Sequence, residues 1–189
     1  MEYKVIPEKM DFTSDVMLPH WAYKKYQLLG DSIIAFCGPL KFDFTKRLNC
    51  KSNEKNCQLK DIDMLHFVIE HFDSNIRETV LRQYLLVSVV EEKLLHRIPE
   101  NGHRIIRLGD DLFDGENLLS TTSINCNLVS NKIHLAIFME ANPGPCFHGL
   151  EAYGVDPCEL AELVINQYRT EMRRLIEKTW KIEPLHGIG

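Results

Sequence analysis

The sequence predicts an α+β fold in which a mixed, mostly antiparallel sheet is backed by helices. Three observations indicate this class: an apolar run at residues 33–37, short β-rich segments between residues 104 and 139, and a long amphipathic segment before residue 180. Strands and helices that occur in separate runs are typical of α+β proteins. Because the 189 residues contain neither a repeat nor a Pro/Gly-rich linker, we expect one domain over residues 1–189.

The first predicted strand is short and buried. Residues 33–37 read IIAFC and are ended by Gly38-Pro39, which cannot easily continue a central strand. The polar stretch at 46–60 has the composition of a surface loop.

Two helices are expected next. Over residues 61–72 the apolar side chains form a broad face on a helical wheel, and Asp63, His66, Glu70 and Asp73 form one polar strip. A longer helix is predicted over 75–96, because LLVSVV lies at its middle and Pro99 follows its end.

A β-meander is predicted between residues 104 and 139, where RIIRL, LLSTTSI and KIHLAIFM are separated by turn-forming residues. In the last of these strands, alternation places Ile133, Leu135, Ile137 and Met139 on one face and His134, Ala136 and Phe138 on the other. Asp156-Pro157 then supplies an N-cap and a proline at the first helical position, so a C-terminal helix is expected from there to about Trp180.

Composition excludes several function classes. The formal net charge of −5 and the pI of about 5.9 argue against general nucleic-acid binding and against binding to an anionic membrane surface. No run of 18 apolar residues is present, and residues 1–10 resemble neither a signal peptide nor a transit peptide. We therefore expect a cytoplasmic protein with no membrane partner.

The six cysteines are expected to be reduced thiols in that compartment. No CxxC pair occurs, so four zinc ligands could be assembled only from distant elements. The sequence therefore predicts no metal site and identifies no cofactor.

Two glycine-aspartate turns are candidate ligand sites. Gly30-Asp31-Ser32 precedes the first strand and Gly109-Asp110-Asp111 follows RIIRL, so each turn can place a carboxylate beside exposed backbone N–H groups. The alternative is that glycine and aspartate simply build turns. Asp110 and Asp111 repel each other, which favours a raised pKa or a nearby cation such as Arg107.

Other candidates lie within predicted elements. His66 and Glu70 are four residues apart, the spacing at which two helical side chains can share a proton; the alternative is a solvated polar strip. His134 lies in an apolar strand, as either a ligand-binding or a buried core histidine. Ser120 and Ser123 offer hydroxyl donors, unless they merely belong to an exposed strand face. No GxSxG, Walker or GxGxxG motif occurs, which argues against serine hydrolases and P-loop enzymes.

The order of several motifs resembles a known family. GDSIIAFCGP at 30–39, MLHFVIEHF at 64–72, LRQYLL at 81–86, RLGDDLFDGENLLSTTSI at 107–124 and VSNKIHLAIFME at 129–140 are similar to the prokaryotic domain of unknown function numbered three hundred and sixty-six. The resemblance implies a biotin/lipoate protein ligase-like fold with a cleft beside the GDS and GDD turns.

One departure from the ligases concerns their reaction. The ligases hold the acyl-adenylate with a lysine just before the strand that LLSTTSI would represent, and this chain has Asn117-Leu118 there. A neutral side chain cannot supply a fixed positive charge to a phosphate or an oxyanion. ATP-dependent acyl transfer is therefore suggested by the fold analogy and not by the residues.

These observations predict a small-ligand-binding cleft whose ligand is an acyl compound or a nucleotide. His66 and Asp111 are the expected catalytic groups for proton transfer. The expected ligand-binding residues are Asp31, Ser32, Glu70, Arg107, Asp110, Ser120, Ser123 and His134. The alternative is a non-enzymatic binding or assembly module that keeps the fold. If a cleft exists, then His66, Asp111 and His134 should lie within about 10 Å of one another, the scale of small-molecule pockets.

The assembly is expected to be a monomer or a homodimer. Apolar residues on the 75–96 helix cover more than one stripe, so a second element must bury the surplus. That element is either the C-terminal helix of the same chain or a symmetry mate that meets Val89.

Overall fold

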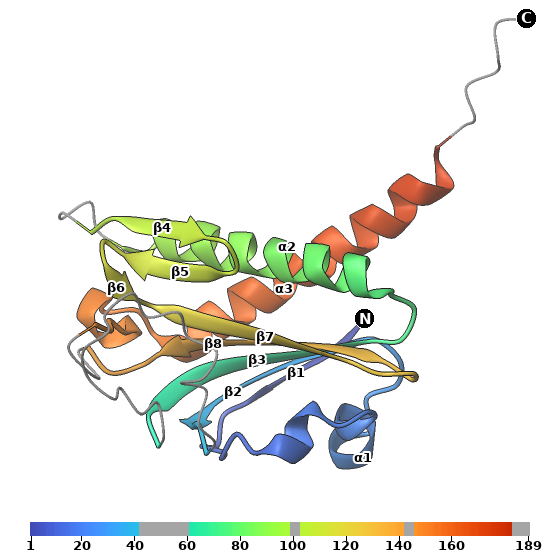
Figure 1. The fold of residues 1–189 in the computed structure, drawn as a ribbon, viewed down its shortest axis with the longest axis horizontal. Helices are drawn as coiled ribbons and strands as arrows, with labels where there is room; N and C mark the ends of the chain where they lie inside the picture. Colours follow the sequence, from blue (N-terminus) through green and yellow to red (C-terminus); the bar gives the residue numbers. More distant parts are fainter. Residues whose placement is uncertain (42–60, 99–102, 142–145, 183–189) are drawn as a thin grey trace, which may run out of the picture.

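The computed structural model describes residues 1–41, 61–98, 103–141 and 146–182 and is built around a five-stranded sheet (Figure 1). The strand order is β1-β2-β3-β8-β7, formed by Glu2–Ile6, Ser32–Pro39, Asp63–His71, Asn131–Phe138 and Ser120–Cys126. β1 pairs with β2 in parallel and the other three pairs are antiparallel. The predicted mixed, mostly antiparallel sheet is thus confirmed. The predicted 46–60 loop lies outside the described residues.

Helices cover this sheet on both sides. α2 (Ile76–Leu95) and α3 (Pro157–Trp180) lie on one face, and α1 (Trp21–Tyr26) lies on the other with the short 3₁₀ helix η1 (Ser14–Met17) (Figure 1). A second sheet of β4 (Ile105–Leu108), β5 (Asp111–Asp114) and β6 (Asn117–Leu118) packs against α2. A second 3₁₀ helix, η2 (Leu150–Tyr153), precedes α3.

The two long helices begin where capping residues predict. The Asn75 side chain accepts a hydrogen bond from the Glu78 N–H, and the Glu78 side chain accepts one from the Asn75 N–H, which is a capping box. The Asp156 carboxylate accepts the Glu159 N–H at 2.7 Å, and Pro157 occupies the first turn of α3. Both helix predictions are confirmed.

The predicted helix over residues 61–72 is wrong, because this segment is the central strand β3. All of its residues from Met64 to His71 are buried, since β3 lies between β2 and β8 and both faces of the sheet are covered. A strand buried on both faces reads as an almost continuous apolar run, which periodicity cannot distinguish from a buried helix. His66 and Glu70 therefore do not form a solvated helical strip.

Alternation along the central strands divides the core in two. The helix-side core contains Ile33, Phe67 and Leu135 with side chains from α2 and α3. The N-terminal-side core contains Phe36, Phe138 and the side chains that residues 12–22 place against the sheet. The predicted alternation of β8 is confirmed, because Ile133, Leu135 and Ile137 belong to the first core, whereas Ala136 and Phe138 belong to the second.

A buried ion pair fixes residues 16–20 to the sheet. The Glu70 carboxylate accepts the His20 N–H and the Ser130 hydroxyl, both at 2.7 Å, and lies 3.5 Å from the Lys132 ammonium. Lys132 also donates to the Val16 carbonyl at 2.7 Å and lies over the Trp21 ring. Because both charges are buried, each needs the other and these backbone partners.

Two buried histidines complete the same face. The Nε2–H of His66 donates to the Gly38 carbonyl at 3.0 Å, which leaves its Nδ1 to accept the Nε2–H of His134 at 3.0 Å. The Phe12 ring stacks on both imidazoles. Burial lowers the pKa of His66 to about 4, and burial together with the neighbouring His66 lowers the pKa of His134. Both rings are therefore neutral near pH 7.

A homodimer contact at Val89 would require this residue to be exposed on α2, and the structure buries it. Val89 is only 4% exposed and packs in the helix-side core, so it is not available to a symmetry mate. The apolar side chains that α2 does expose are Ile76, Leu81, Tyr84 and Leu95. The choice between monomer and homodimer stays a prediction.

No helix among the described residues is long and apolar enough to cross a membrane.

Gly38 is expected to be required for packing of the N-terminal segment. A Cβ atom at this position would overlap the Met10 carbonyl, a backbone group that cannot rotate away. Gly38→Ala should therefore lower the free energy of unfolding by about 2 kcal/mol or more, measured by urea denaturation. Gly115→Ala is the control, because Gly115 has a φ of 60° but open space around it, and should cost about 1 kcal/mol. A smaller loss for Gly38→Ala than for the control would contradict this packing.

The buried His66 should make the protein less stable in mild acid. Between pH 6.5 and about 4 the unfolded chain binds a proton at residue 66 and the folded chain does not. The free energy of unfolding should therefore fall as the pH falls, by about 1.4 kcal/mol per pH unit from this group. His66→Gln keeps a donor for Gly38 and an acceptor for His134 but does not titrate, so its pH dependence should be shallower.

The matched control is His96→Gln, because His96 is exposed at the end of α2. Urea denaturation at several pH values should give this variant the wild-type slope. Identical slopes for His66→Gln and the wild type would show that His66 is already charged in the folded protein.

Candidate functional site

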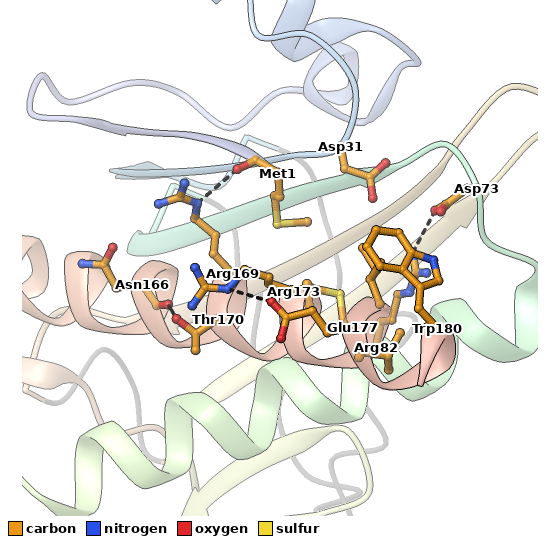
Figure 2. A pocket seen from close by; sticks show the side chains of 13 residues that line it. Met1, Asp31, Asp73, Arg82, Asn166, Arg169, Thr170, Arg173, Glu177 and Trp180 are labelled. Atoms are coloured by element: carbon orange, nitrogen blue, oxygen red, sulfur yellow. Dashed lines mark hydrogen bonds and ion pairs between the residues drawn. The ribbon is translucent and has the colours of Figure 1, made fainter. Parts of the chain in front are cut away.

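A pocket of about 470 Å³ lies where α3 passes the starts of β1 and β2 and the N-terminal half of α2 (Figure 2). This volume is in the range that small-molecule sites occupy. Its charged and polar lining consists of Asp31, Asp73, Arg82, Asn166, Arg169, Thr170, Arg173 and Glu177. Apolar side chains, including Met172, Leu175 and Trp180, form the remainder.

The Arg169 side chain in this pocket is held in place by two neutral groups. Its Nε–H donates to the Met1 carbonyl at 3.1 Å, and its guanidinium lies 4.1 Å from the centre of the Tyr3 ring. Both partners are neutral, and in the described part of the chain no carboxylate forms an ion pair with Arg169. The guanidinium is thus held in place while its charge remains uncompensated.

The other two arginines of the pocket have acidic partners. Arg82 lies 3.4 Å from the Asp73 carboxylate, and Arg173 lies 3.8 Å from the Glu177 carboxylate one helical turn away (Figure 2). The Arg173 and Glu177 side chains are both exposed, so they bind each other weakly and a ligand can compete for Arg173. In the other pair Asp73 is exposed, whereas the Arg82 side chain is only 13% exposed. Among the described residues the pocket therefore offers one guanidinium without an acidic partner, Arg169, and one whose exposed ion pair a ligand can displace, Arg173.

Asp31 connects the pocket to a buried chain of hydrogen bonds. Its Oδ2 lies 2.6 Å from Nδ1 of His71, and Nε2 of His71 lies 3.0 Å from the Tyr168 hydroxyl. Its Oδ1 accepts the Phe72 N–H at 3.0 Å. Burial favours the neutral acid, but the hydrogen bonds from His71 and from the Phe72 N–H outweigh it, so the pKa of Asp31 lies below its ordinary value. The carboxylate is therefore charged and rigidly held.

The structure separates the ten predicted site residues into three groups. Asp31 lines the pocket. Ser32, His66, Glu70, Ser123 and His134 share the opposite face of the sheet, where Ser32 pairs with Glu70 and Ser123 with His134 across the strands. His66 and His134 are thus brought into contact as expected, but all five residues are buried beneath the N-terminal segment.

The third group lies around the second sheet. Asp110 accepts hydrogen bonds from Gln83 and Thr122, both at 3.1 Å, and Asp111 accepts the Thr122 N–H at 3.0 Å. Burial, and then the neighbouring Asp110, raise the pKa of Asp111 to about 7. Ser120 accepts the Leu112 N–H. Arg107 donates to α2 and pairs with neither aspartate among the described contacts.

A further polar cluster was not predicted. The buried Asp114 carboxylate accepts hydrogen bonds from His103, Tyr153 and His148 at 2.8, 3.0 and 3.3 Å, and from the Arg104 N–H. Burial opposes ionisation, but these donors lower the pKa of Asp114. The amide of Asn117 lies 3.3 Å from Nε2 of His148. These residues come from segments up to 50 positions apart in sequence, so no local motif identifies them.

The pocket residues on α3 were also missed, for a different reason. Arg169 and Arg173 are four apart on a helix, which usually indicates a solvated face. His71 and Tyr168 are 97 positions apart and meet only because α3 crosses the sheet beside β3. The one available signal was the Gly30-Asp31-Ser32 turn, which does place its carboxylate in the pocket.

Comparison with known proteins shows similarity over nearly the whole chain. An uncharacterised protein of Methanocaldococcus jannaschii is 30% identical, in an alignment that covers 95% of this chain and 83% of the relative. Among solved structures, a protein of unknown function from Pyrococcus horikoshi superposes with a TM-score of 0.77 at 24% identity, covering 98% of this chain and 100% of that one.

Biotin and lipoate ligases share the fold at lower identity. The biotin protein ligase from Aquifex aeolicus in complex with biotin and ATP gives a TM-score of 0.59 at 14% identity, over 93% of this chain and 72% of that one. A protein from T. acidophilum with bound lipoic acid gives 0.54 at 10% identity, over 92% and 87%. The family described as Domain of unknown function (DUF366) matches residues 1–183. The chain therefore belongs to this family and has a biotin/lipoate protein ligase-like fold.

Proposed function

We propose that the protein binds a small molecule through an anionic group, a carboxylate or a phosphate, in the pocket lined by Arg169. The observation that supports this most directly is a guanidinium that Met1 and Tyr3 hold in place and that has no ion-pair partner in the part of the chain the structure describes. Arginine binds carboxylate and phosphate through two parallel hydrogen bonds, and fixing the side chain beforehand lowers the cost of binding.

The shape and lining of the pocket favour a ligand with both polar and apolar parts. Arg169 and Thr170 bind the anionic end, while Leu175, Ile176 and Trp180 contact an apolar portion. Acyl compounds and nucleotides both combine such parts. The ligase-like structures include complexes with biotin and ATP and with lipoic acid, so the fold accommodates ligands of this kind in other proteins.

We propose binding without ATP-dependent ligation. The resemblance to the ligases implies a lysine where this chain has Asn117, and the Asn117 amide contacts His148. A neutral amide cannot stabilise the charge that develops on an acyl-adenylate. His66, expected to transfer protons, donates to Gly38 and accepts from His134 deep in the core. In this proposal His66 has a structural role.

The second candidate function is a binding or assembly module without a small ligand. It is favoured by the burial of Glu70, His66 and His134, which leaves the polar residues of that sheet face closed to a ligand. It predicts that no acyl compound or nucleotide stabilises the protein.

Arg169 should be the residue on which ligand binding depends most. A thermal-shift screen with biotin, lipoate, ATP, AMP and inorganic phosphate should identify a ligand that raises the Tm of the wild type, and titration calorimetry should measure its affinity. Arg169→Gln should weaken that affinity at least about tenfold, since a hydrogen bond to a charged group contributes about 1.5–3 kcal/mol. Arg77→Gln, on an exposed part of α2 outside the pocket, should bind like the wild type.

Asp111→Ala distinguishes the two predicted turns. Asp111 lies beside Thr122 and is not among the residues that line this pocket in the described part of the chain, so the variant should retain the ligand-induced shift. Loss of the shift in Asp111→Ala but not in Arg169→Gln would place the ligand at the GDD turn. If no ligand raises the Tm of the wild type, the result would favour the binding or assembly module without a small ligand.

A further inference from the structure

We infer that Asp31, His71 and Asp73 form a binding site for a divalent transition-metal ion at the edge of the pocket. One ligand atom from each residue lies within 4.8 Å of the others, so a small side-chain movement brings all three into contact with one ion. A set of one imidazole and two carboxylates suits ions such as Zn²⁺, Co²⁺ or Mn²⁺ better than Ca²⁺, which prefers oxygen ligands alone.

The surroundings of these residues match those of metal ligands. His71 is fully buried, and the Tyr168 hydroxyl 3.0 Å from its Nε2 can accept the Nε2–H. In that tautomer the Nδ1 that faces Asp31 carries no proton. The Asp31 carboxylate is oriented by the Phe72 N–H through the oxygen that does not face His71. Outer hydrogen bonds of this kind fix the tautomer and orientation of metal-binding side chains.

Metal binding requires one rearrangement. Without metal, the 2.6 Å contact is a hydrogen bond from Nδ1–H of His71 to Asp31, and Nε2 accepts the Tyr168 hydroxyl. When the ion replaces that hydrogen bond, the proton of His71 lies on Nε2 and the Tyr168 oxygen becomes the acceptor. Tyrosine can serve in both states, because its hydroxyl both donates and accepts.

Arg82 opposes the ion. Its guanidinium pairs with Asp73 at 3.4 Å and repels a cation bound there.

An ion held by three protein ligands has further coordination positions open to other molecules. Two of its ligands, Asp31 and Asp73, also line the pocket. The ion therefore faces the space assigned to the anionic ligand, but its binding to the three side chains does not depend on that ligand.

The test uses Co²⁺ alone and the full-length chain without a histidine tag or added anionic ligand. Co²⁺ should bind with a stoichiometry of one and give visible d–d bands without a thiolate charge-transfer band. Asp73→Asn should weaken binding by about tenfold or more, because losing an outer hydrogen bond alone costs 10- to 100-fold. The Asp73 side chain is 73% exposed, so this change should not affect folding.

Two further variants make the result specific. Asp11→Asn removes an exposed carboxylate elsewhere and should leave the affinity unchanged. Arg82→Gln should tighten Co²⁺ binding several-fold, since it removes the opposing charge. Equal affinities of the wild type and Asp73→Asn, no binding at millimolar Co²⁺, or a thiolate band would each overturn the site. Ligand binding by metal-free protein in EDTA is measured separately, so failure of one proposal does not imply failure of the other.

Discussion

The structure depends on a sheet whose central strands are buried on both faces. β3 and β8 are buried on both sides, so every polar group on them must find a partner within the protein. On the N-terminal side Glu70 and Lys132 meet this requirement by pairing with each other and with backbone groups at Val16 and His20. Removing either charge would leave the other buried and unpaired, at a cost of about 3–5 kcal/mol.

This constraint explains why polar residues on the two faces have different roles. On the face covered by the N-terminal segment, the histidine pair and the ion pair serve packing, and their partners are other core groups. On the helix side, His71 belongs to the last pair of β3 and lies next to the point where the sheet ends and α3 passes over it. Polar groups at that edge can reach solvent and ligand through Asp31, whereas those at the centre cannot.

The sequence predicted most of the fold, because its signals were local. Asn75 and Asp156 cap their helices, and the alternation of residues 133–138 assigns each side chain to the correct core. It failed at residues 61–72 because an apolar run buried on both faces carries no period of two, and β1 and α1 were not anticipated. Alternation cannot show which partner covers a strand, and that depends on the whole topology.

The candidate site was less predictable. Only Asp31 was found in advance, since a glycine-aspartate turn is a local signal, whereas its partners His71, Tyr168 and Arg169 come from other elements. Conversely, His66 and Glu70 were singled out for a helical spacing that does not exist. Their placement on one face survives because positions four apart also share a face in a strand.

The contact between Lys132 and Val16 spans 116 residues and has a consequence for the order of synthesis. The chain is made from its N-terminus, so Phe12, Val16 and Trp21 leave the ribosome long before β8, the strand that carries Lys132 and His134, exists to receive them. During that interval these side chains can contact only the segments made before β8, such as Phe36 of β2, which packs against Phe12 and Trp21. The segment that carries them therefore cannot complete its docking until β8 has been made, and its apolar side chains remain partly unburied and prone to aggregation until then.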